Sequence, residues 1–372
     1  MKTKAAVLHR PGSPLRIEEL EVEEPGPREI GVKLVASGVC GTDLHAALGD
    51  FSLPTPLVLG HEGAGIVNQV GPGVSAVSPG DHVILSSIAS CGLCDRCVSG
   101  EPYLCKWGLK TIETGTLFSG ATRLRRGQER VYRLFGQGSF AGYVIVDERM
   151  AVKVPDDAPL HVAALLSCGA TTGIGAVLNT AGVRPGEAVA VFGCGGVGLS
   201  AIMGAVLVGA EPIIAVDVVE WKLEVARTLG ATAIVSATGA DPVSAIRNLT
   251  NGGADYAFEC IGKVEVMAQA YESIRAGGKV IVCGAAPRGS QLNIDPDALL
   301  QGKAIIGCAA GSTRFHVDVP RLLSLYRRGL LPLDRLISNT YSLEEIDAAL
   351  DAIRRGRALK CVITLAGEGP IL

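Results

Sequence analysis

The chain has 372 residues, of which 48% are hydrophobic and 19% are charged. This composition excludes an intrinsically disordered protein, and the length indicates about two or three domains. Lysine and arginine number 34 and aspartate and glutamate 37, so the net charge of −3 argues against a nucleic-acid-binding protein.

The beginning of the chain and its cysteines bear on where the protein works. Residues 1–10 contain no apolar region of a signal peptide. Apolar stretches such as 199–208 are far shorter than the ~20 residues of a membrane-spanning helix. We therefore expect a soluble cytoplasmic protein without membrane contact. Because the cytosol keeps thiols reduced, the 11 cysteines favour metal binding over disulfides.

Short β segments between Pro- and Gly-rich turns occupy the first half of the chain. This pattern is typical of a small β barrel or sandwich. The clearest segments are residues 30–37, 63–70, 82–85 and 143–146.

Three residues with metal-binding side chains stand far apart in Gly-containing motifs. They are Cys40 in VCGTDLH, His61 in LGHEGAG and Cys168 in LLSCGA. Taken singly, each is more often a core residue than a ligand. Together, two thiolates and one imidazole would leave the fourth position of a zinc ion open for chemistry. The neighbours support this interpretation, because Asp43 can fix the tautomer of His61 and Glu62 is a spare oxygen ligand.

Four further cysteines lie close together in the sequence. Cys91, Cys94, Cys97 and Cys105 have the spacing C-x2-C-x2-C-x7-C. Four thiolates complete a closed tetrahedral site, which is typical of structural zinc. The spacing alone also allows an iron–sulfur cluster, but no following proline or partner cluster supports one.

After about residue 171, short β-branched runs alternate with helix-length segments. This rhythm predicts an α/β fold with a doubly wound, parallel, six-stranded sheet. The six strands are expected at residues 188–192, 212–216, 233–235, 256–259, 279–282 and 304–306.

A glycine-rich turn connects the first of these strands to a helix expected from about residue 196 to 208. It reads Gly193, Cys194, Gly195, Gly196, Val197 and Gly198, which matches G-x-G-x-x-G in the strand–turn–helix setting of a dinucleotide site. Gly193 allows the tight turn, and Gly195 lets the backbone approach a pyrophosphate at the helix N-terminus. Gly198 allows the helix to pack closely on the strand.

The second strand ends in Asp217, nineteen residues after Gly198. A carboxylate here would accept hydrogen bonds from the adenosine ribose and repel a 2′-phosphate, so we expect NAD rather than NADP. Lys222 is a secondary candidate for the same ribose.

The tail carries helical periodicity at residues 320–328 and 343–354, followed by a strand at 361–365 that we expect to rejoin the first domain.

The other cysteines lie in or beside predicted strands and the cofactor turn, which favours core packing. They are Cys194, Cys260, Cys283, Cys308 and Cys361.

These motifs, in this order and over nearly the whole chain, resemble the zinc-dependent medium-chain alcohol dehydrogenases. The resemblance is greatest to the branch of the liver-type and glutathione-dependent enzymes. It implies a β-rich GroES-like catalytic domain at residues 1–169, with a structural zinc lobe at about 90–106. A Rossmann NAD-binding domain would follow at 170–310, and 311–372 would rejoin the catalytic domain, with the active site in the cleft.

The resemblance also implies roles for individual residues. Cys40, His61 and Cys168 would hold a catalytic zinc, with Glu62 as a possible alternate ligand, and the four-cysteine lobe would hold a second zinc. The catalytic machinery would include Asp43 and Glu62 around the metal, and a proton relay through Thr42 and the cofactor ribose to His45. Thr172 would lie under the nicotinamide and Lys360 would approach the pyrophosphate.

The expected function is NAD- and zinc-dependent interconversion of a primary or secondary alcohol and its aldehyde or ketone by hydride transfer. Phe51, Leu57, Leu109 and Ile112 predict an apolar pocket in which Ser87 leaves room for an aromatic alcohol. Phe51 and Leu109 stand where the glutathione-dependent branch uses charged groups, which disfavours a thiol-adduct substrate.

The function, the oligomeric state and the effect of Gly41 stay open at this stage. The alternative functions are those of a polyol or hydroxyacyl thioester dehydrogenase of the same superfamily, or of a non-catalytic, zinc-stabilised binding protein. The resemblance implies a homodimer or homotetramer built by extending the Rossmann sheet. Gly41 stands where several relatives carry a basic residue that grips the pyrophosphate, so cofactor release is expected to be faster.

Overall fold

A computed structural model describes residues 1–239 and 241–365. Its internal contacts divide the chain into two compact units. The first unit comprises Met1–Cys168, Arg314–Arg327 and the chain from Leu333 onward, and the second comprises Gly169–Thr313 and Arg328–Pro332. The limits expected from the sequence, after residues 169 and 310, lie one and three residues from this division.

The second unit is built on a six-stranded sheet in the order β14-β13-β12-β15-β16-β17. Every neighbouring pair in this order is parallel. The strands are β12 (Val189–Phe192), β13 (Ile213–Asp217), β14 (Ala233–Ser236), β15 (Ala254–Glu259), β16 (Ile274–Val282) and β17 (Ala304–Gly307). This order is that of a doubly wound nucleotide-binding sheet, and all six predicted strands are confirmed.

Helices alternate with these strands along the chain. They are α5 (Gly169–Gly175), α6 (Gly196–Leu207), α7 (Glu220–Thr228), α8 (Pro242–Leu249), α9 (Val264–Ser273) and α10 (Asp297–Leu300). Eight consecutive residues of α6, Gly198–Ala205, are buried, as expected for a helix that is apolar on all sides. The helix predicted from about residue 196 to 208 is confirmed.

The first unit contains two largely antiparallel sheets. One has six strands in the order β8-β7-β2-β1-β4-β9. The other has seven, in the order β11-β6-β5-β3-β19-β18 with β10 on the edge of β3. The first sheet is formed by β1 (Lys2–Leu8), β2 (Arg16–Val22), β4 (Leu57–Val58), β7 (Leu124–Arg126), β8 (Glu129–Arg130) and β9 (Tyr132–Arg133). The second is formed by β3 (Glu29–Val39), β5 (Glu62–Val70), β6 (His82–Leu85), β10 (Tyr143–Asp147), β11 (Ala151–Val154), β18 (Ile337–Ser342) and β19 (Lys360–Thr364).

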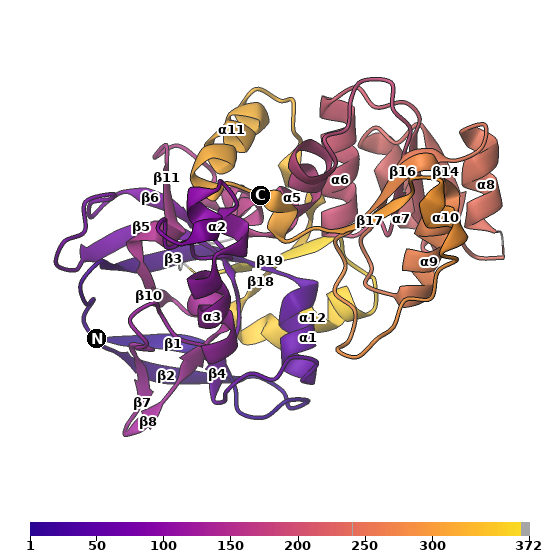
Figure 1. Ribbon diagram of the computed structural model, residues 1–372. Helices are drawn as coiled ribbons and strands as arrows, with labels where there is room; N and C mark the ends of the chain where they lie inside the picture. Colours follow the sequence, from indigo (N-terminus) through magenta and orange to yellow (C-terminus); the bar gives the residue numbers. More distant parts are fainter. Residues whose placement is uncertain (240, 366–372) are drawn as a thin grey trace. The chain divides into compact units, whose positions relative to one another are not determined.

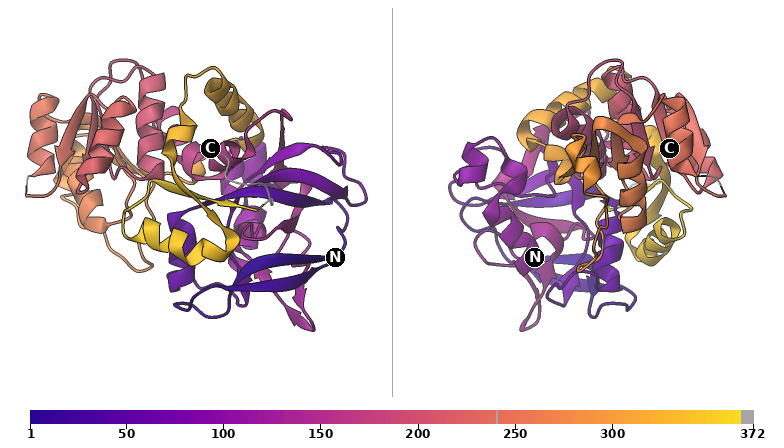
Figure 2. Two further views of the ribbon diagram at one scale, coloured as in Figure 1. Left: turned by 180° about the vertical axis from the view of Figure 1, so that it is seen from behind. Right: turned by 45° about the vertical axis from the view of Figure 1, so that its right-hand side comes forward.

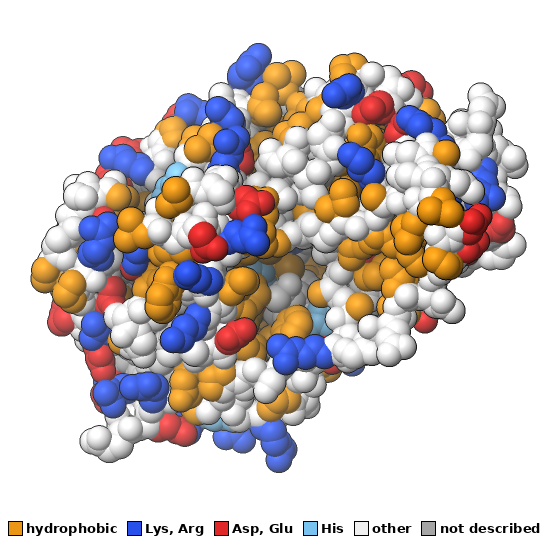
Figure 3. Space-filling view, in the orientation of Figure 1, with side chains coloured by type: hydrophobic (Ala, Val, Ile, Leu, Met, Phe, Trp, Pro, Cys, Tyr) orange, Lys and Arg blue, Asp and Glu red, His pale blue; other side chains and the backbone are white. Residues whose placement is uncertain are grey.

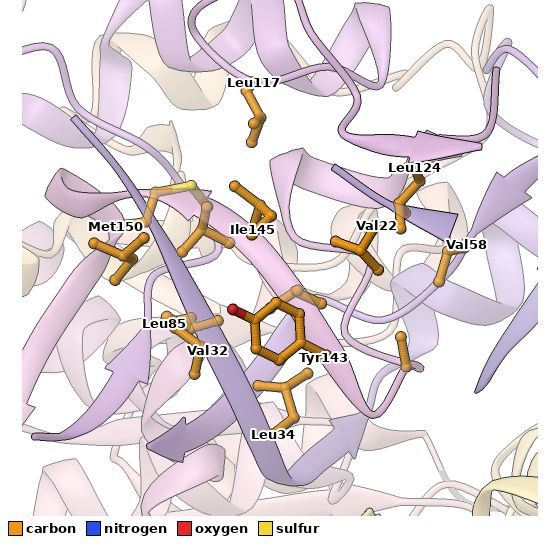
Figure 4. Close-up of a cluster of buried hydrophobic side chains, with 14 of the residues drawn as sticks. Val22, Val32, Leu34, Val58, Leu85, Leu117, Leu124, Tyr143, Ile145 and Met150 are labelled. Atoms are coloured by element: carbon orange, nitrogen blue, oxygen red, sulfur yellow. The ribbon is translucent and has the colours of Figure 1, made fainter. Parts of the chain in front are cut away.

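The two sheets pack against each other through a shared hydrophobic core. Inward-facing side chains from both sheets meet in it, including Val22 and Val58 from one and Val32, Leu34 and Ile145 from the other (Figure 4). The strands predicted in the first half all belong to the second sheet. The first sheet begins with β1 and β2, which the sequence analysis did not identify.

The end of the chain completes the second sheet. Strand β19 pairs antiparallel with β3 and parallel with β18 (Figure 2). The prediction that the last strand rejoins the first domain is therefore confirmed, whereas β18 was missed. The helices of this unit are α1 (Gly41–Leu48), α2 (Asp95–Val98), α3 (Lys106–Thr114), α4 (Leu160–Ala163), α11 (Phe315–Arg327) and α12 (Ile346–Arg354).

Within residues 1–239 and 241–365, no single helix is both long and apolar enough to span a membrane. The consecutive helices Leu160–Ser167 and Gly169–Ala181 meet the same test of length and composition only when taken together as a bent pair.

Candidate metal centres and dinucleotide site

The three dispersed ligand candidates come together in the first unit. Cys40 follows β3 and caps α1, His61 directly precedes β5, and Cys168 follows a short helical turn. With the carboxylate of Glu62, their ligand atoms all lie within 4.8 Å of one another. The fold therefore gathers four potential metal ligands from segments up to 128 residues apart in the sequence.

Asp43 holds this cluster in place through three hydrogen bonds. Its Oδ1 lies 3.0 Å from Nδ1 of His61 and accepts a hydrogen bond from the Gly60 amide at 3.0 Å. Its Oδ2 accepts one from the Cys40 amide at 2.9 Å. The predicted contact with His61 is present, and it directs the Nδ1 proton to the carboxylate, leaving Nε2 for a metal.

The surroundings of His61 fit a cation. Its Nε2 is buried without an ordinary hydrogen-bond partner among the described residues, and it faces the Cys40 sulfur. Burial would lower the pKa of His61, but the charges of Asp43 and Cys40 outweigh it and raise the pKa well above its usual value. A buried polar atom without a partner is rare, and a zinc ion would satisfy it.

The sulfurs of Cys40 and Cys168 also lie where a cation would be stabilised. A hydrogen bond from Cys168 lowers the pKa of Cys40 well below its usual value, and the same hydrogen bond and burial raise that of Cys168. Two adjacent buried thiolates repel each other, so ionisation of Cys40 disfavours ionisation of Cys168. A divalent cation would allow both thiols to ionise.

Glu62 is not exposed to solvent and is paired with Lys360 from β19. The Lys360 ammonium lies 2.5 Å from Oε2 of Glu62, and the two side chains are 6% and 0% exposed. Burial raises the pKa of Glu62 while the Lys360 charge opposes that rise. Lys360 thus contributes a positive charge beside the ligand cluster. Its expected role at the pyrophosphate stays a prediction.

Two residues of the site were missed by the sequence analysis. The ring of Phe135 lies against His61, with 4.9 Å between centroids, and its backbone has a φ of +53°. Such a φ is rare for a bulky residue, so the surrounding structure must hold this ring in place. Gln137 donates a hydrogen bond to the Ser86 carbonyl and accepts one from the Gly63 amide. Neither residue stands in a recognisable motif.

The residues of the expected proton relay lie on α1. The Thr42 hydroxyl oxygen is 3.7 Å from the Cys40 sulfur. His45, one turn later, is partly exposed, and its Nδ1 lies 2.6 Å from Oδ2 of Asp50. A relay from the ligand cluster to solvent needs one end beside Cys40 and the other at the surface, which Thr42 and His45 provide. Asp50 was not identified from the sequence.

Of the residues expected to form an apolar pocket, Phe51 and Ser87 lie beside site residues, whereas Leu57 lies in a hydrophobic core cluster. Phe51 lies beside His45, with 5.9 Å between ring centroids. The Ser87 amide donates a hydrogen bond to the Ser167 carbonyl, next to Cys168. Leu57, in contrast, is buried in a hydrophobic core cluster, because β4 pairs with β1.

The four cysteines of the lobe form a second cluster, whose sulfurs all lie within 4.8 Å of one another. Sulfur–sulfur distances are 4.0 Å for Cys91 and Cys97 and 3.9 Å for Cys94 and Cys105. A tetrahedron with Zn–S bonds of about 2.3 Å has edges of about 3.8 Å, so the cluster has the dimensions of a zinc site.

Backbone amides support negative charge on these sulfurs. The amides of Leu93 and Cys94 donate to Cys91, and those of Cys91 and Gly108 donate to Cys105. A hydrogen bond from the Cys97 backbone lowers the pKa of Cys94 to about 6. Burial raises that of Cys97 to about 12. A bound cation would remove this conflict between neighbouring thiols.

The glycine-rich turn of the second unit has the geometry of a dinucleotide loop. Gly193 has a φ of +92°, which favours glycine. A Cβ on Gly198 would lie 1.7 Å from the Gly193 carbonyl oxygen, so only glycine fits. A Cβ on Gly195, which caps α6, would meet nothing within 4 Å, so the backbone is open there for an approaching pyrophosphate.

Asp217 ends β13 beside this loop. Its Oδ2 accepts a hydrogen bond from the Cys194 amide at 2.6 Å, and its Oδ1 accepts one from the Val219 amide at 2.9 Å. These bonds fix the carboxylate while each oxygen retains acceptor capacity for a ribose hydroxyl. Lys222 is half-buried on α7, and Thr172 is buried in α5.

Comparisons with known proteins identify relatives over almost the whole chain. The alcohol dehydrogenase GroES-like domain model matches residues 26–156, and the zinc-binding dehydrogenase model matches 196–327. An S-(hydroxymethyl)glutathione dehydrogenase of Escherichia coli is 39% identical over 98% of this chain and all of its own length.

Two solved structures are also similar. An alcohol dehydrogenase zinc-binding domain protein from Burkholderia ambifaria is 39% identical, with a TM-score of 0.95 over 98% of this chain and 99% of its own. Benzyl alcohol dehydrogenase from Acinetobacter calcoaceticus is 38% identical, with a TM-score of 0.94 over 98% of this chain and all of its own. With both domain models matched and this likeness from end to end, the chain belongs to the zinc-dependent medium-chain alcohol dehydrogenases.

Proposed function

We propose that this zinc-dependent dehydrogenase acts on apolar and aromatic alcohols, which it interconverts with their aldehydes or ketones. The observation that carries this proposal is the Phe135 ring, held 4.9 Å from the His61 ring beside the ligand cluster. An aromatic ring at that place favours a flat apolar substrate by stacking or edge contact, worth about 0.5–1.5 kcal/mol beyond the burial of its surface. The likeness to a benzyl alcohol dehydrogenase supports the same substrate class.

Zinc would be held at two places in the first unit. Cys40, His61 and Cys168 would hold the catalytic ion, with Glu62 as a possible alternate ligand. Cys91, Cys94, Cys97 and Cys105 would hold the structural ion. The catalytic ion supplies Lewis-acid polarisation of the substrate oxygen. Asp43 positions His61, and Lys360 balances the charge of Glu62.

The proton of the alcohol would leave through α1. The relay would run through the Thr42 hydroxyl and the cofactor ribose to His45, which would pass the proton to solvent. An imidazole both donates and accepts protons, which suits a shuttle, and the hydrogen bond of His45 to Asp50 sets the ring orientation.

We propose NAD as the dinucleotide, bound by residues 170–310. The carboxylate of Asp217 favours ribose hydroxyls over a 2′-phosphate. Gly193, Gly195, Gly196, Val197 and Gly198 would receive the pyrophosphate, with Lys222, Thr172 and Lys360 as further contacts. Residues 1–169 and 311–372 would form the catalytic domain.

The test is reduction of NAD⁺ and of NADP⁺ by the zinc-loaded protein with benzyl alcohol, ethanol and a sugar alcohol. We expect kcat/KM for benzyl alcohol to exceed that for ethanol at least 100-fold, because a buried phenyl ring contributes about 3 kcal/mol. NAD⁺ should be preferred. Phe135→Ala should lower kcat/KM for benzyl alcohol more than for ethanol, and Phe118→Ala, which changes a ring that packs against Arg149, is the matched control. Equal kcat/KM values for benzyl alcohol and ethanol would contradict the proposal.

A second candidate substrate is S-hydroxymethylglutathione, because a relative named for it is 39% identical. Glutathione carries charged carboxylates, whereas this chain has the apolar Phe51 and Leu109 where charged groups are expected for that substrate. Turnover of formaldehyde with glutathione above that of benzyl alcohol would favour this candidate.

We also propose a homo-oligomer. Strand β17 is an edge of its sheet, and α10 beside it exposes Leu299 and Leu300 at 47% and 86%. Figure 3 shows hydrophobic side chains gathered over the face that carries α10. Pairing of two β17 strands would cover this face and extend the sheet.

All 11 cysteines are free thiols, which supports a reducing compartment such as the cytoplasm.

A further inference from the structure

Three cysteines of the second unit form a row at one edge of its sheet. Cys260, Cys283 and Cys308 directly follow β15, β16 and β17. The register pairs Glu259 with Val282 and Val282 with Gly307, so the three cysteines occupy corresponding positions on adjacent parallel strands. The expectation that these cysteines pack in the core is wrong, because all three are only partly buried, unlike Cys194 and Cys361.

Cys283 lies between the other two cysteines, on the middle strand of the three. Interaction with Cys260 raises the pKa of Cys283 well above its usual value, Cys308 opposes this rise, and burial adds to it. The hydrogen bond to Cys283 and burial raise that of Cys308. Cys308 also lies 3.4 Å from the Thr180 hydroxyl. Cys260 stands at the end of the row, where its amide donates a hydrogen bond to the Phe192 carbonyl that precedes the dinucleotide loop.

The backbones that follow Cys260 and Cys283 lie close together. A Cβ on Gly284 would lie 2.1 Å from the Gly262 amide nitrogen, and one on Gly262 would lie 2.4 Å from the Ala285 carbonyl oxygen. Adjacent strands are about 4.8 Å apart, within the Cα separation of 4.4–6.8 Å that a disulfide requires.

We propose that Cys260 and Cys283 are a redox modification site at which hydrogen peroxide generates a reversible disulfide between the two cysteines. The Cys260 sulfur attacks a peroxide oxygen, the O–O bond breaks, and the released hydroxide takes the Cys260 proton, so that a sulfenic acid and one water form. The Cys283 sulfur then attacks the Cys260 sulfur, the S–O bond breaks, and the released hydroxide takes the Cys283 proton to give a second water. The two sulfurs lose two electrons, which the peroxide gains.

The site adjoins the dinucleotide loop. The Cys260 amide donates a hydrogen bond to the Phe192 carbonyl at 2.9 Å, and a Cβ on Gly193 would lie 2.6 Å from the Ile261 side chain. A bond that draws residue 260 toward β16 would shift Ile261 against this loop. We therefore expect the disulfide to weaken NADH binding and bound NADH to slow its formation.

Trypsin separates the three cysteines onto peptides 248–263, 280–288 and 304–314. The zinc-loaded protein would be treated with hydrogen peroxide, alkylated, digested and analysed by mass spectrometry. We expect a cross-link between 248–263 and 280–288 that dithiothreitol reverses and Cys260→Ser abolishes. Cys308→Ser, the matched control, should keep it. No cross-link, or one between 280–288 and 304–314, would overturn the assignment.

NADH fluorescence titration tests the consequence apart from turnover. Oxidation should raise the Kd for NADH roughly tenfold or more in the wild type and in Cys308→Ser, but not in Cys260→Ser. An unchanged Kd in a fully cross-linked sample would refute the effect on the dinucleotide loop. These readouts do not depend on which alcohol the enzyme oxidises.

Discussion

Removing one partner of the buried pair of Lys360 and Glu62 should destabilise the metal-free protein strongly. At 2.5 Å and an effective dielectric constant of about 20, the attraction of the two charges is about 7 kcal/mol. Desolvation offsets part of it, and removing one partner of a buried pair costs about 3–5 kcal/mol because the other charge stays buried. Lys360→Met leaves the Glu62 carboxylate beside the Cys40 sulfur. For a unit of about 200 residues, we expect the melting temperature of the zinc-free protein to fall by roughly 10 °C.

Differential scanning calorimetry of zinc-free and zinc-loaded protein measures this effect. Zinc should reduce the loss, since a cation replaces the missing charge. The double variant Glu62→Gln/Lys360→Met should recover most of the stability, because neither charge remains. Lys2→Met, which breaks the exposed pair with Glu19, is the control and should change the melting temperature by no more than about 1 °C. A double variant as unstable as Lys360→Met would refute the reasoning.

Three further changes test the metal and cofactor sites. Asp43→Asn should weaken zinc binding at the Cys40 site about 10- to 100-fold in a chelator competition, because His61 loses its carboxylate partner; unchanged affinity would count against that role. Cys97→Ser should lower the zinc content, measured by atomic absorption, by about one ion per chain, and it should also lower the melting temperature. Retention of both ions would contradict the four-thiol site. Gly41→Arg should slow NADH release in stopped-flow experiments, since a Cβ at Gly41 meets nothing within 4 Å; unchanged rates would refute the effect of this glycine.

The sequence predicted those features that depend on neighbours along the chain. The six parallel strands contain short runs of β-branched residues between helix-length segments, and the central strands β12 and β13 are almost fully buried, so the alternation of strand and helix is clear from the sequence. Asp43 stands three residues after Cys40, which places its carboxylate at the Cys40 amide. Its predicted contact with His61, 18 residues away, rested on the two ligand motifs taken together. Strand β18, ISNTYS, is polar and mostly exposed, and its pairing with β19 has no local pattern.

Other features depend on tertiary contacts that one sequence does not specify. Lys360 reaches Glu62 across 298 residues. The ring of Phe135 meets His61 through a left-handed backbone conformation that propensity disfavours. Cys260, Cys283 and Cys308 resemble ordinary small core residues until the register of the sheet aligns them.

The pairing of β19 with β3 bears on how the protein matures during synthesis. The second unit has all its residues once the chain has grown past Pro332, whereas the second sheet of the first unit is completed only when Lys360–Thr364 has been made. Until then both zinc clusters have their cysteines, but the ammonium that neutralises Glu62 is missing. We therefore expect the cluster of Cys40, His61, Glu62 and Cys168 to attract a cation more strongly before Lys360 is in place than afterwards. Translation order would then favour metal binding at this cluster ahead of closure of the sheet.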